Sequence, residues 1–165
     1  MTAALRIPLR LVIDTNVVLD LYHFQRPTVA PITQMIANGE ALCFTCPRTL
    51  EELRHVLPRE HFRLDEAGQA ALLDRYTAQS LCARDPESAL DLPACKDTSD
   101  QKFLQLAASV AADYLLTRDK ALLRLAKRVR KKRALTLTTP ERFLADQALF
   151  TTSANKASTI CAPSA

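Results

Sequence analysis

The sequence predicts an α/β fold, a three-layer α/β/α sandwich with a mainly parallel sheet of about five strands. Short runs of branched apolar residues alternate along the chain with segments whose apolar residues recur at helical spacing. One such run, Leu11–Ile13, has the length and composition of a strand buried on both faces. It ends abruptly at Asp14, which puts a carboxylate where open α/β sheets place their ligands. The rest of the chain is organised around this stretch.

Length and composition limit the possible functions. A chain of 165 residues with 48% hydrophobic and 24% charged residues fits one globular domain. The sequence has no apolar run long enough to span a membrane, and Met1–Arg10 lacks the apolar centre of a signal peptide. We therefore expect a cytoplasmic protein without membrane association, and five reduced cysteines. Only two glycines are present, which excludes a glycine-rich phosphate loop.

The first half of the chain predicts two strands and four helices. Asn38-Gly39 is a typical helix end, and Pro47 suits the first turn of the next helix. In chain order we expect a short helix from Val17 to Leu21, a helix over Thr28–Ala37, a strand over Ala41–Thr45, a helix from Pro47 to about Leu57, and a helix over Asp65–Ala78.

The second half predicts further alternation of strands and helices. Thr98 and Gln101 have the spacing of a capping box that opens a helix over Ser99–Ala111. Residues 1–150 form the expected domain, and residues 151–165, small, polar and aperiodic, are expected to be a disordered tail. The other expected elements are an edge strand over Gln79–Ala83, a loop over Asp85–Lys96, a strand over Asp113–Thr117, a helix over Lys120–Arg130, a strand over Ala134–Thr138 and a helix from Thr139-Pro140 to about Leu149.

Topology brings four acids from distant segments to one edge of the sheet. Parallel strands end on one side, and the crossover helices begin on that same side. Asp14 and Asp119 follow predicted strands, and Asp100 lies in the first turn of a helix. Glu52 is about five residues into its helix, only roughly 7–8 Å along the axis.

Each of these acids has a simpler structural interpretation. Asp14 and Asp119 could cap the helices that follow them. An acid in the first turn interacts favourably with the helix dipole, which explains the position of Asp100 along its helix. It does not explain why Asp100 lies on the apolar stripe of that helix. An inward carboxylate is costly without a partner. The stripe consists of Phe103, Leu104, Ala107 and Ala111.

Two further acids stay open at this point. Periodicity does not separate Glu51 from Glu52, since neither lies on the inner stripe of the helix. Asp97 is best interpreted as a loop acid, with a supporting role as the alternative.

The constellation of acids predicts a metal site. Several carboxylates within a few ångströms cannot all ionise unless a cation neutralises them. Oxygen ligands without His or Cys suit Mg²⁺ or Mn²⁺ better than zinc. Cys43 and Cys46 have the spacing of a zinc or redox motif, but on a strand these positions point to opposite faces, and no second such pair exists.

Four motifs together resemble the PIN-domain family. They are Val-Ile-Asp-Thr-Asn at 12–16, Leu-Glu-Glu-Leu-Arg-His-Val-Leu at 50–57, Asp-Gln-Lys-Phe-Leu-Gln-Leu-Ala at 100–107 and Tyr-Leu-Leu-Thr-Arg-Asp at 114–119. Their order and spacing also match, and the resemblance covers roughly residues 9–149. The chain is most similar to the single-domain, VapC-like toxin components of bacterial toxin–antitoxin systems.

The resemblance implies strand order 3-2-1-4-5 and a metal-dependent endoribonuclease that hydrolyses RNA phosphodiester bonds. It also implies a cognate antitoxin partner, and we expect a homodimer or a higher homo-oligomer. It assigns the catalytic acids to Asp14, Glu52, Asp100 and Asp119, favouring Glu52 over Glu51. Asp14, Asp100 and Asp119 are expected to bind the metal, Mg²⁺ or Mn²⁺. The expected supporting residues are Asn16, Thr117 and Asp97.

A basic segment predicts contact with a polyanion. Residues 118–133 carry nine Lys or Arg and one Asp, a local charge of +8 in a chain whose net charge is +4. We expect RNA binding by Arg118, Arg124, Lys127, Arg128 and Lys131, with a solvated helix face as the alternative. Two other functions remain possible from the sequence, a non-catalytic RNA-binding module and a metal-dependent phosphatase.

Overall fold

The computed structural model describes residues 8–87 and 91–158, and the side chains of residues 8–87 and 91–150. A five-stranded parallel sheet with order β3-β2-β1-β4-β5 runs through its centre, which confirms the predicted fold class and strand order. The strands are β1 (Leu9–Ile13), β2 (Ala41–Thr45), β3 (Ser80–Cys82), β4 (Tyr114–Leu116) and β5 (Thr136–Thr138).

β1 is the central strand, the third of five in the sheet order, and pairs with β2 and β4. Leu11 lies opposite Cys43 of β2 and opposite Tyr114 of β4. The pairing continues past the strand, where the Asp14 N–H donates to the Leu116 carbonyl at 2.9 Å. Leu11 and Val12 are fully buried, as a strand covered on both faces requires.

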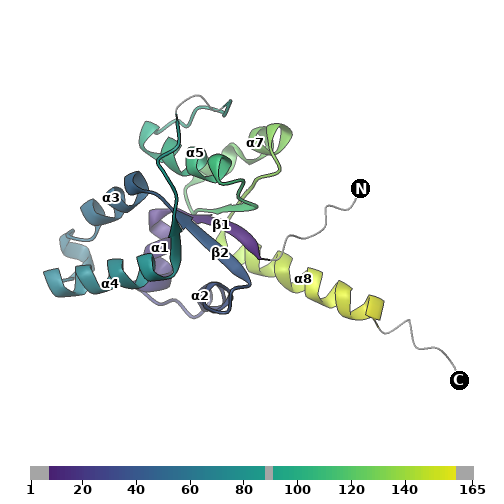
Figure 1. The fold of residues 1–165 in the computed structure, drawn as a ribbon, viewed down its shortest axis with the longest axis horizontal. Helices are drawn as coiled ribbons and strands as arrows, with labels where there is room; N and C mark the ends of the chain where they lie inside the picture. The colour runs from purple at the N-terminus through teal and green to yellow at the C-terminus, as the bar shows by residue number, and fades with distance from the viewer. Residues whose placement is uncertain (1–7, 88–90, 159–165) are drawn as a thin grey trace, which may run out of the picture.

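Five helices pack with one apolar core on the first face of the sheet (Figure 1). Alternate residues of β1, such as Leu11 and Ile13, point into this core, together with Ile32, Leu53 and Phe143 from the helices. The helices are α1 (Thr15–Tyr22), α2 (Ala30–Ala37), α3 (Pro47–Val56), α4 (Glu66–Ala78) and α8 (Pro140–Ser158).

The second face is covered by α5 (Gln101–Ser109) and α7 (Ala126–Lys132), which lie near each other in Figure 1. Val12 of β1 and Leu115 of β4 contribute to this second core, with Phe103 from α5 and Val129 from α7. Both faces of the sheet are therefore sealed, and its edges and its carboxyl end remain for function. Three short elements complete the fold: η1 (Glu60–Phe62), η2 (Thr98–Asp100) and α6 (Lys120–Arg124).

The predicted capping box at the start of α5 does not form. Asp97, not Thr98, precedes the turn η2, and its carboxylate accepts from the Ser99 N–H at 2.8 Å. The Gln101 side chain instead accepts from the Cys95 N–H and donates to the Pro93 carbonyl. Gln101 therefore fastens the preceding loop, and α5 begins at Gln101 rather than at Ser99.

Two other helices differ from the sequence expectation. The single helix expected over Lys120–Arg130 is divided into α6 and α7 at Leu125, whose N–H bonds to the Leu122 carbonyl in a tighter turn. α8 continues past Leu149 to Ser158 and projects from the body of the protein in Figure 1. Once a helix has formed, extending it by residues of low helix propensity costs little free energy. The remainder of the expected tail, residues 159–165, lies outside the described residues.

A buried acid on α1 organises an ion-pair network. Asp20 is only 4% exposed, and its two carboxylate oxygens bind Arg26 at 2.7 Å and Arg118 at 2.5 Å. The other end of the Arg118 guanidinium makes a two-pronged contact with Glu141, at 2.6 and 3.1 Å. Through Arg118 the network joins α1, the end of β4 and the first turn of α8.

The four described cysteines, Cys43, Cys46, Cys82 and Cys95, are free thiols, and Cys161 lies outside the described residues. Cys43 belongs to the first core and Cys46 to the second, in agreement with the predicted opposite faces. No helix in the described part of the chain combines the length and the apolar character that crossing a membrane requires.

Candidate active site

Asp14 lies at the carboxyl end of β1, 4% exposed, directly before α1. Although it occupies the cap position of α1, its carboxylate bonds elsewhere: Oδ2 accepts from the Thr117 hydroxyl at 2.6 Å and from the Asn16 amide at 2.9 Å. Burial raises the pKa of Asp14, the Thr117 bond lowers it, and the charge of Glu52 raises it. The cap interpretation therefore does not describe its side chain.

Glu52 comes from the second turn of α3, and its side chain is 22% exposed. The Thr15 hydroxyl donates to its Oε1 at 2.7 Å, and the Lys102 ammonium forms an ion pair with its Oε2. Glu51, in contrast, is 59% exposed and pairs with Arg54 and His55 on the outside of the same helix. The geometry thus directs Glu52, and not Glu51, towards Asp14.

Asp100 ends η2 at the start of α5 and is partly buried. The pKa of Asp100 is raised to about 6, first by burial and then by the negative charges of Asp14, Asp119, Asp97 and Glu52. This carboxyl group therefore lies in the combined field of all the acids that topology assigned to this edge. The like charges make the ionised form of Asp100 costly.

Asp119 caps α6, as its structural interpretation expected: its Oδ1 accepts from the Leu122 N–H at 2.8 Å. The Thr117 hydroxyl links it to the central acid, because Oγ1 accepts from the Asp119 N–H at 3.0 Å while it donates to Asp14. Asp119 thus has a structural bond and also contributes negative charge at Asp100.

The predicted supporting residues divide into two groups. Thr117, fully buried, and Asn16 both donate to Asp14 and so fix the orientation of its carboxylate. Asp97 is exposed, and its bond to Ser99 lowers its pKa, which makes it a cap of the η2 turn. It acts on the site through its charge on Asp100.

Sequence reasoning missed Thr15 and Lys102. Both contact Glu52, one from the first turn of α1 and the other from the first turn of α5. The sequence feature that could have indicated them is their position, since each lies within two residues of a candidate acid, Asp14 or Asp100. The Lys102 side chain is 15% exposed, which is low for a lysine and indicates a role inside the site.

The donor chemistry of the edge fits a hard divalent cation. All candidate ligands are carboxylate oxygens, and their mutual repulsion at Asp100 is what a cation would relieve. Over residues 8–87 and 91–150, no three His, Cys, Asp or Glu side chains are already close enough to hold an ion. Lys102 places a positive charge beside Glu52.

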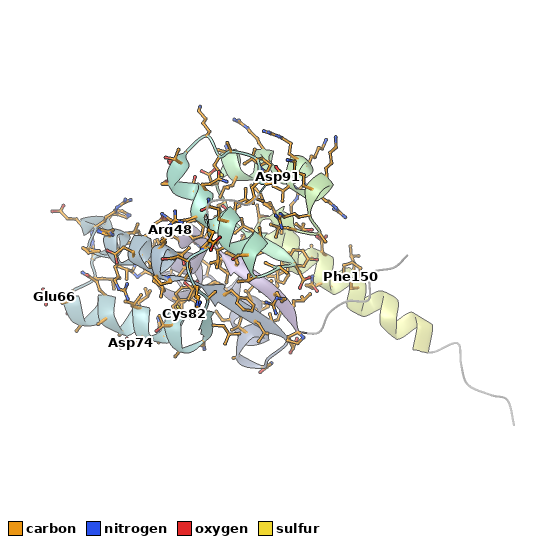
Figure 2. All side chains as sticks on the ribbon, turned by 45° about the horizontal axis from the view of Figure 1, so that its top comes forward. Arg48, Glu66, Asp74, Cys82, Asp91 and Phe150 are labelled. Atoms are coloured by element: carbon orange, nitrogen blue, oxygen red, sulfur yellow. The ribbon has the colours of Figure 1, made fainter. Side chains whose placement is uncertain are left out.

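The predicted RNA-binding residues also divide. The Arg118 guanidinium is taken up by Asp20 and Glu141, so it does not form part of a free basic face. Arg124, Lys127, Arg128 and Lys131 are exposed on α6 and α7. Figure 2 shows nitrogen-tipped side chains extending from the helices near Asp91, the residue that pairs with Lys132.

Comparison with known proteins supplies a family and a fold. The family model of the PIN domain matches residues 10–121, a range that includes all four candidate acids. The crystal structure of VapBC2 from Rickettsia felis bound to a DNA fragment from their promoter is similar, with a TM-score of 0.53 and 11% sequence identity. That match covers 79% of this chain and 98% of the other chain. Among curated proteins no match was found.

Proposed function

Because this chain belongs to the PIN-domain family, whose members are generally nucleases, we propose that it is a metal-dependent endoribonuclease that hydrolyses RNA phosphodiester bonds. We assign the nuclease domain to residues 1–150. The observation that carries the proposal is the electrostatic coupling of Asp100 to Asp14, Asp119 and Glu52, three acids from distant segments. A structural cap does not need such a concentration of like charge.

Asp14, Asp100 and Asp119 would hold Mg²⁺ or Mn²⁺. When bound, such an ion stabilises negative charge on a phosphodiester oxygen and lowers the pKa of a water molecule. Thr117 and Asn16 orient the Asp14 carboxylate. Thr15 and Lys102 hold Glu52 next to the metal-binding acids, where its carboxylate can accept a proton from the attacking water.

Cleavage of a labelled single-stranded RNA tests the proposal. We expect cleavage by the wild type in Mg²⁺ or Mn²⁺, its loss on addition of EDTA and its return with excess metal. Asp14→Asn should lower the rate by roughly 100-fold or more, since the central charge is removed while Asn keeps the shape. Asp74→Asn is the matched control, because Asp74 is exposed on α4 (Figure 2), and it should cleave as the wild type does.

Two results would contradict the nuclease. RNA binding without cleavage in either metal would favour a non-catalytic RNA-binding module. Turnover of a generic aryl phosphate with no RNA cleavage would favour a phosphatase.

The basic face of α6 and α7, defined as Arg124, Lys127, Arg128 and Lys131, is proposed to bind RNA phosphates along the strand. Replacing Arg124, Lys127 and Arg128 by Ala should raise KM and reduce the slope of log KM against log salt concentration by about 2, at about 0.7 for each phosphate contact. A salt slope equal to that of the wild type would show that these basic residues do not bind RNA and only keep the helix surface solvated.

We also propose that the protein is the toxin of a toxin–antitoxin pair, acting in the cytoplasm as a homodimer or a larger assembly. The fold similarity to the VapBC2 structure supports this proposal. The antitoxin would cover the acidic edge with an Arg or another basic group. Normal growth of cells that produce the active wild type alone would contradict it.

A further inference from the structure

A second polar hollow lies beside the acidic edge, between the first turn of α3 and the η2 turn that precedes α5. Arg48, Thr98, Ser99 and Lys102 line it, together with the carboxylates of Glu51 and Asp85. Figure 2 shows Arg48 where α3 approaches α5, in agreement with the contact between its guanidinium and Gln105 of α5. The four candidate acids, Asp14, Glu52, Asp100 and Asp119, do not line this hollow.

The hollow borders the candidate active site, and Lys102 belongs to both. Lys102 lines it and also forms the ion pair with Glu52. Thr98 and Ser99 belong to the same η2 turn that ends in Asp100. A strand of RNA whose scissile phosphate lies at the acids therefore passes within reach of this hollow.

The Arg48 guanidinium has no ion-pair partner among the described residues; the Asp85 carboxylate, which also has none, binds the backbone of the same residue. The Glu51 carboxylate is directed to Arg54 and His55, and the Asp85 carboxylate accepts the Arg48 backbone N–H at 3.0 Å. The Arg48 guanidinium contacts only the neutral amide oxygen of Gln105, at 3.4 Å, among the described residues. An exposed guanidinium with no carboxylate partner is suited to binding a phosphate.

We propose that this hollow binds a phosphate group of the RNA strand next to the scissile one, with Arg48 as the principal contact. The proposal rests on the proposed nuclease function. Thr98 and Ser99 add hydroxyl donors at the same position. Among the described residues no aromatic side chain lines the hollow, and a guanidinium contact to a phosphate carries no sequence information, so we expect binding without regard to sequence.

The test is Arg48→Gln, which removes the guanidinium but keeps the backbone N–H that bonds to Asp85. With labelled single-stranded RNA as substrate, we expect KM to rise roughly tenfold, as for loss of one charged hydrogen bond. We expect kcat to stay within about twofold, because Arg48 does not contact the acids, and the salt slope of log KM to fall by about 0.7. The loss should be similar for RNAs of different sequence.

Arg59→Gln is the matched control. Arg59 is an exposed arginine just after α3, outside the hollow and without an ion pair to any residue that lines it among the described residues, and its replacement should leave KM and the salt slope unchanged. Melting temperatures of both variants should equal that of the wild type, so that a KM effect reports binding.

The outcomes separate this proposal from the nuclease itself. If the wild type cleaves RNA and Arg48→Gln has the KM and salt slope of the wild type, the subsite is wrong and the nuclease stands. If the wild type does not cleave, fluorescence anisotropy with the same RNA decides: a loss of affinity in Arg48→Gln but not in Arg59→Gln supports the subsite. Equal affinities of the two variants overturn it.

Discussion

Asp100→Asn is expected to abolish metal-dependent RNA cleavage while making the metal-free protein more stable. The pKa of Asp100 is raised to about 6 because the ionised carboxylate is partly buried among four other acids. Asn removes that repulsion and keeps the shape of the side chain. We expect cleavage to fall by roughly 100-fold or more.

Calorimetry with EDTA and with added metal measures the stability effect. Mg²⁺ or Mn²⁺ at about 100 times its dissociation constant should stabilise the wild type by about 2.7 kcal/mol, roughly 5–10 °C in melting temperature. The same addition should shift the melting temperature of Asp100→Asn much less, because a proposed ligand is lost.

The pH dependence of the free energy of unfolding provides a second test of Asp100. A carboxyl group whose folded pKa is raised stabilises the fold below its unfolded pKa of 3.8 and loses that contribution as pH rises through about 6. In EDTA, the wild type should therefore lose about 1 kcal/mol between pH 4 and pH 7, after discounting for solvent screening. Asp100→Asn should lack this part of the slope.

Asp65→Asn is the control, because Asp65 caps α4 through the Gly68 N–H and lies outside the acid edge. Asn caps about as well as Asp, so this variant should respond to metal and pH as the wild type does. Full metal-dependent cleavage by Asp100→Asn would overturn the assignment of the site.

Arg118→Ala is expected to cause the largest loss of stability. Asp20 is buried and would keep only Arg26, whose side chain is 56% exposed, as a partner. Leaving a buried charge undercompensated costs several kcal/mol, and with Arg26 still present we expect about 2 kcal/mol. The melting temperature should fall by roughly 4–8 °C in metal-free buffer.

Lys132→Ala breaks a surface pair of comparable length, that of Lys132 with the 80% exposed Asp91. It should change the free energy of unfolding by less than about 1 kcal/mol. Adding Asp20→Asn to Arg118→Ala should recover part of the loss, since no buried charge is then left. If Arg118→Ala and Lys132→Ala were equally mild, the network around Asp20 would not be structural.

The sequence predicted the fold class and the edge of the sheet at which the acids lie, whereas the strand order and the choice of Glu52 over Glu51 came from the family resemblance. Alternating apolar runs and helical spacing are local signals, and the parallel topology then puts Asp14, Glu52, Asp100 and Asp119 at the same edge. Their shared influence at Asp100 agrees with that expectation. The inward face of Asp100, expected from its place on the apolar stripe, agrees with its partial burial.

The remaining features depend on side-chain choices between segments far apart in sequence. Arg118 lies in a basic segment, and no local pattern indicates that it pairs with Asp20, 98 residues earlier. In the sequence, Lys102 resembles an ordinary surface lysine of a helix, and only the packing of α3 against α5 brings it to Glu52. Gln101 has the spacing of a capping box. Its side-chain amide instead accepts a hydrogen bond from the Cys95 N–H and donates one to the Pro93 carbonyl, and the sequence does not indicate these bonds.

Because β1 lies at the centre of the sheet, the candidate active site forms only after the later strand β4 has paired with it. Thr117 and Asp14 are 103 residues apart, and their bond requires β4 to close against β1 across that whole loop. Such long closures are entropically costly and slow. A nascent chain that ends before Tyr114 has Asp14, Glu52 and Asp100 but lacks Asp119 and Thr117. The acids therefore come together late in synthesis, when almost the entire domain has been made.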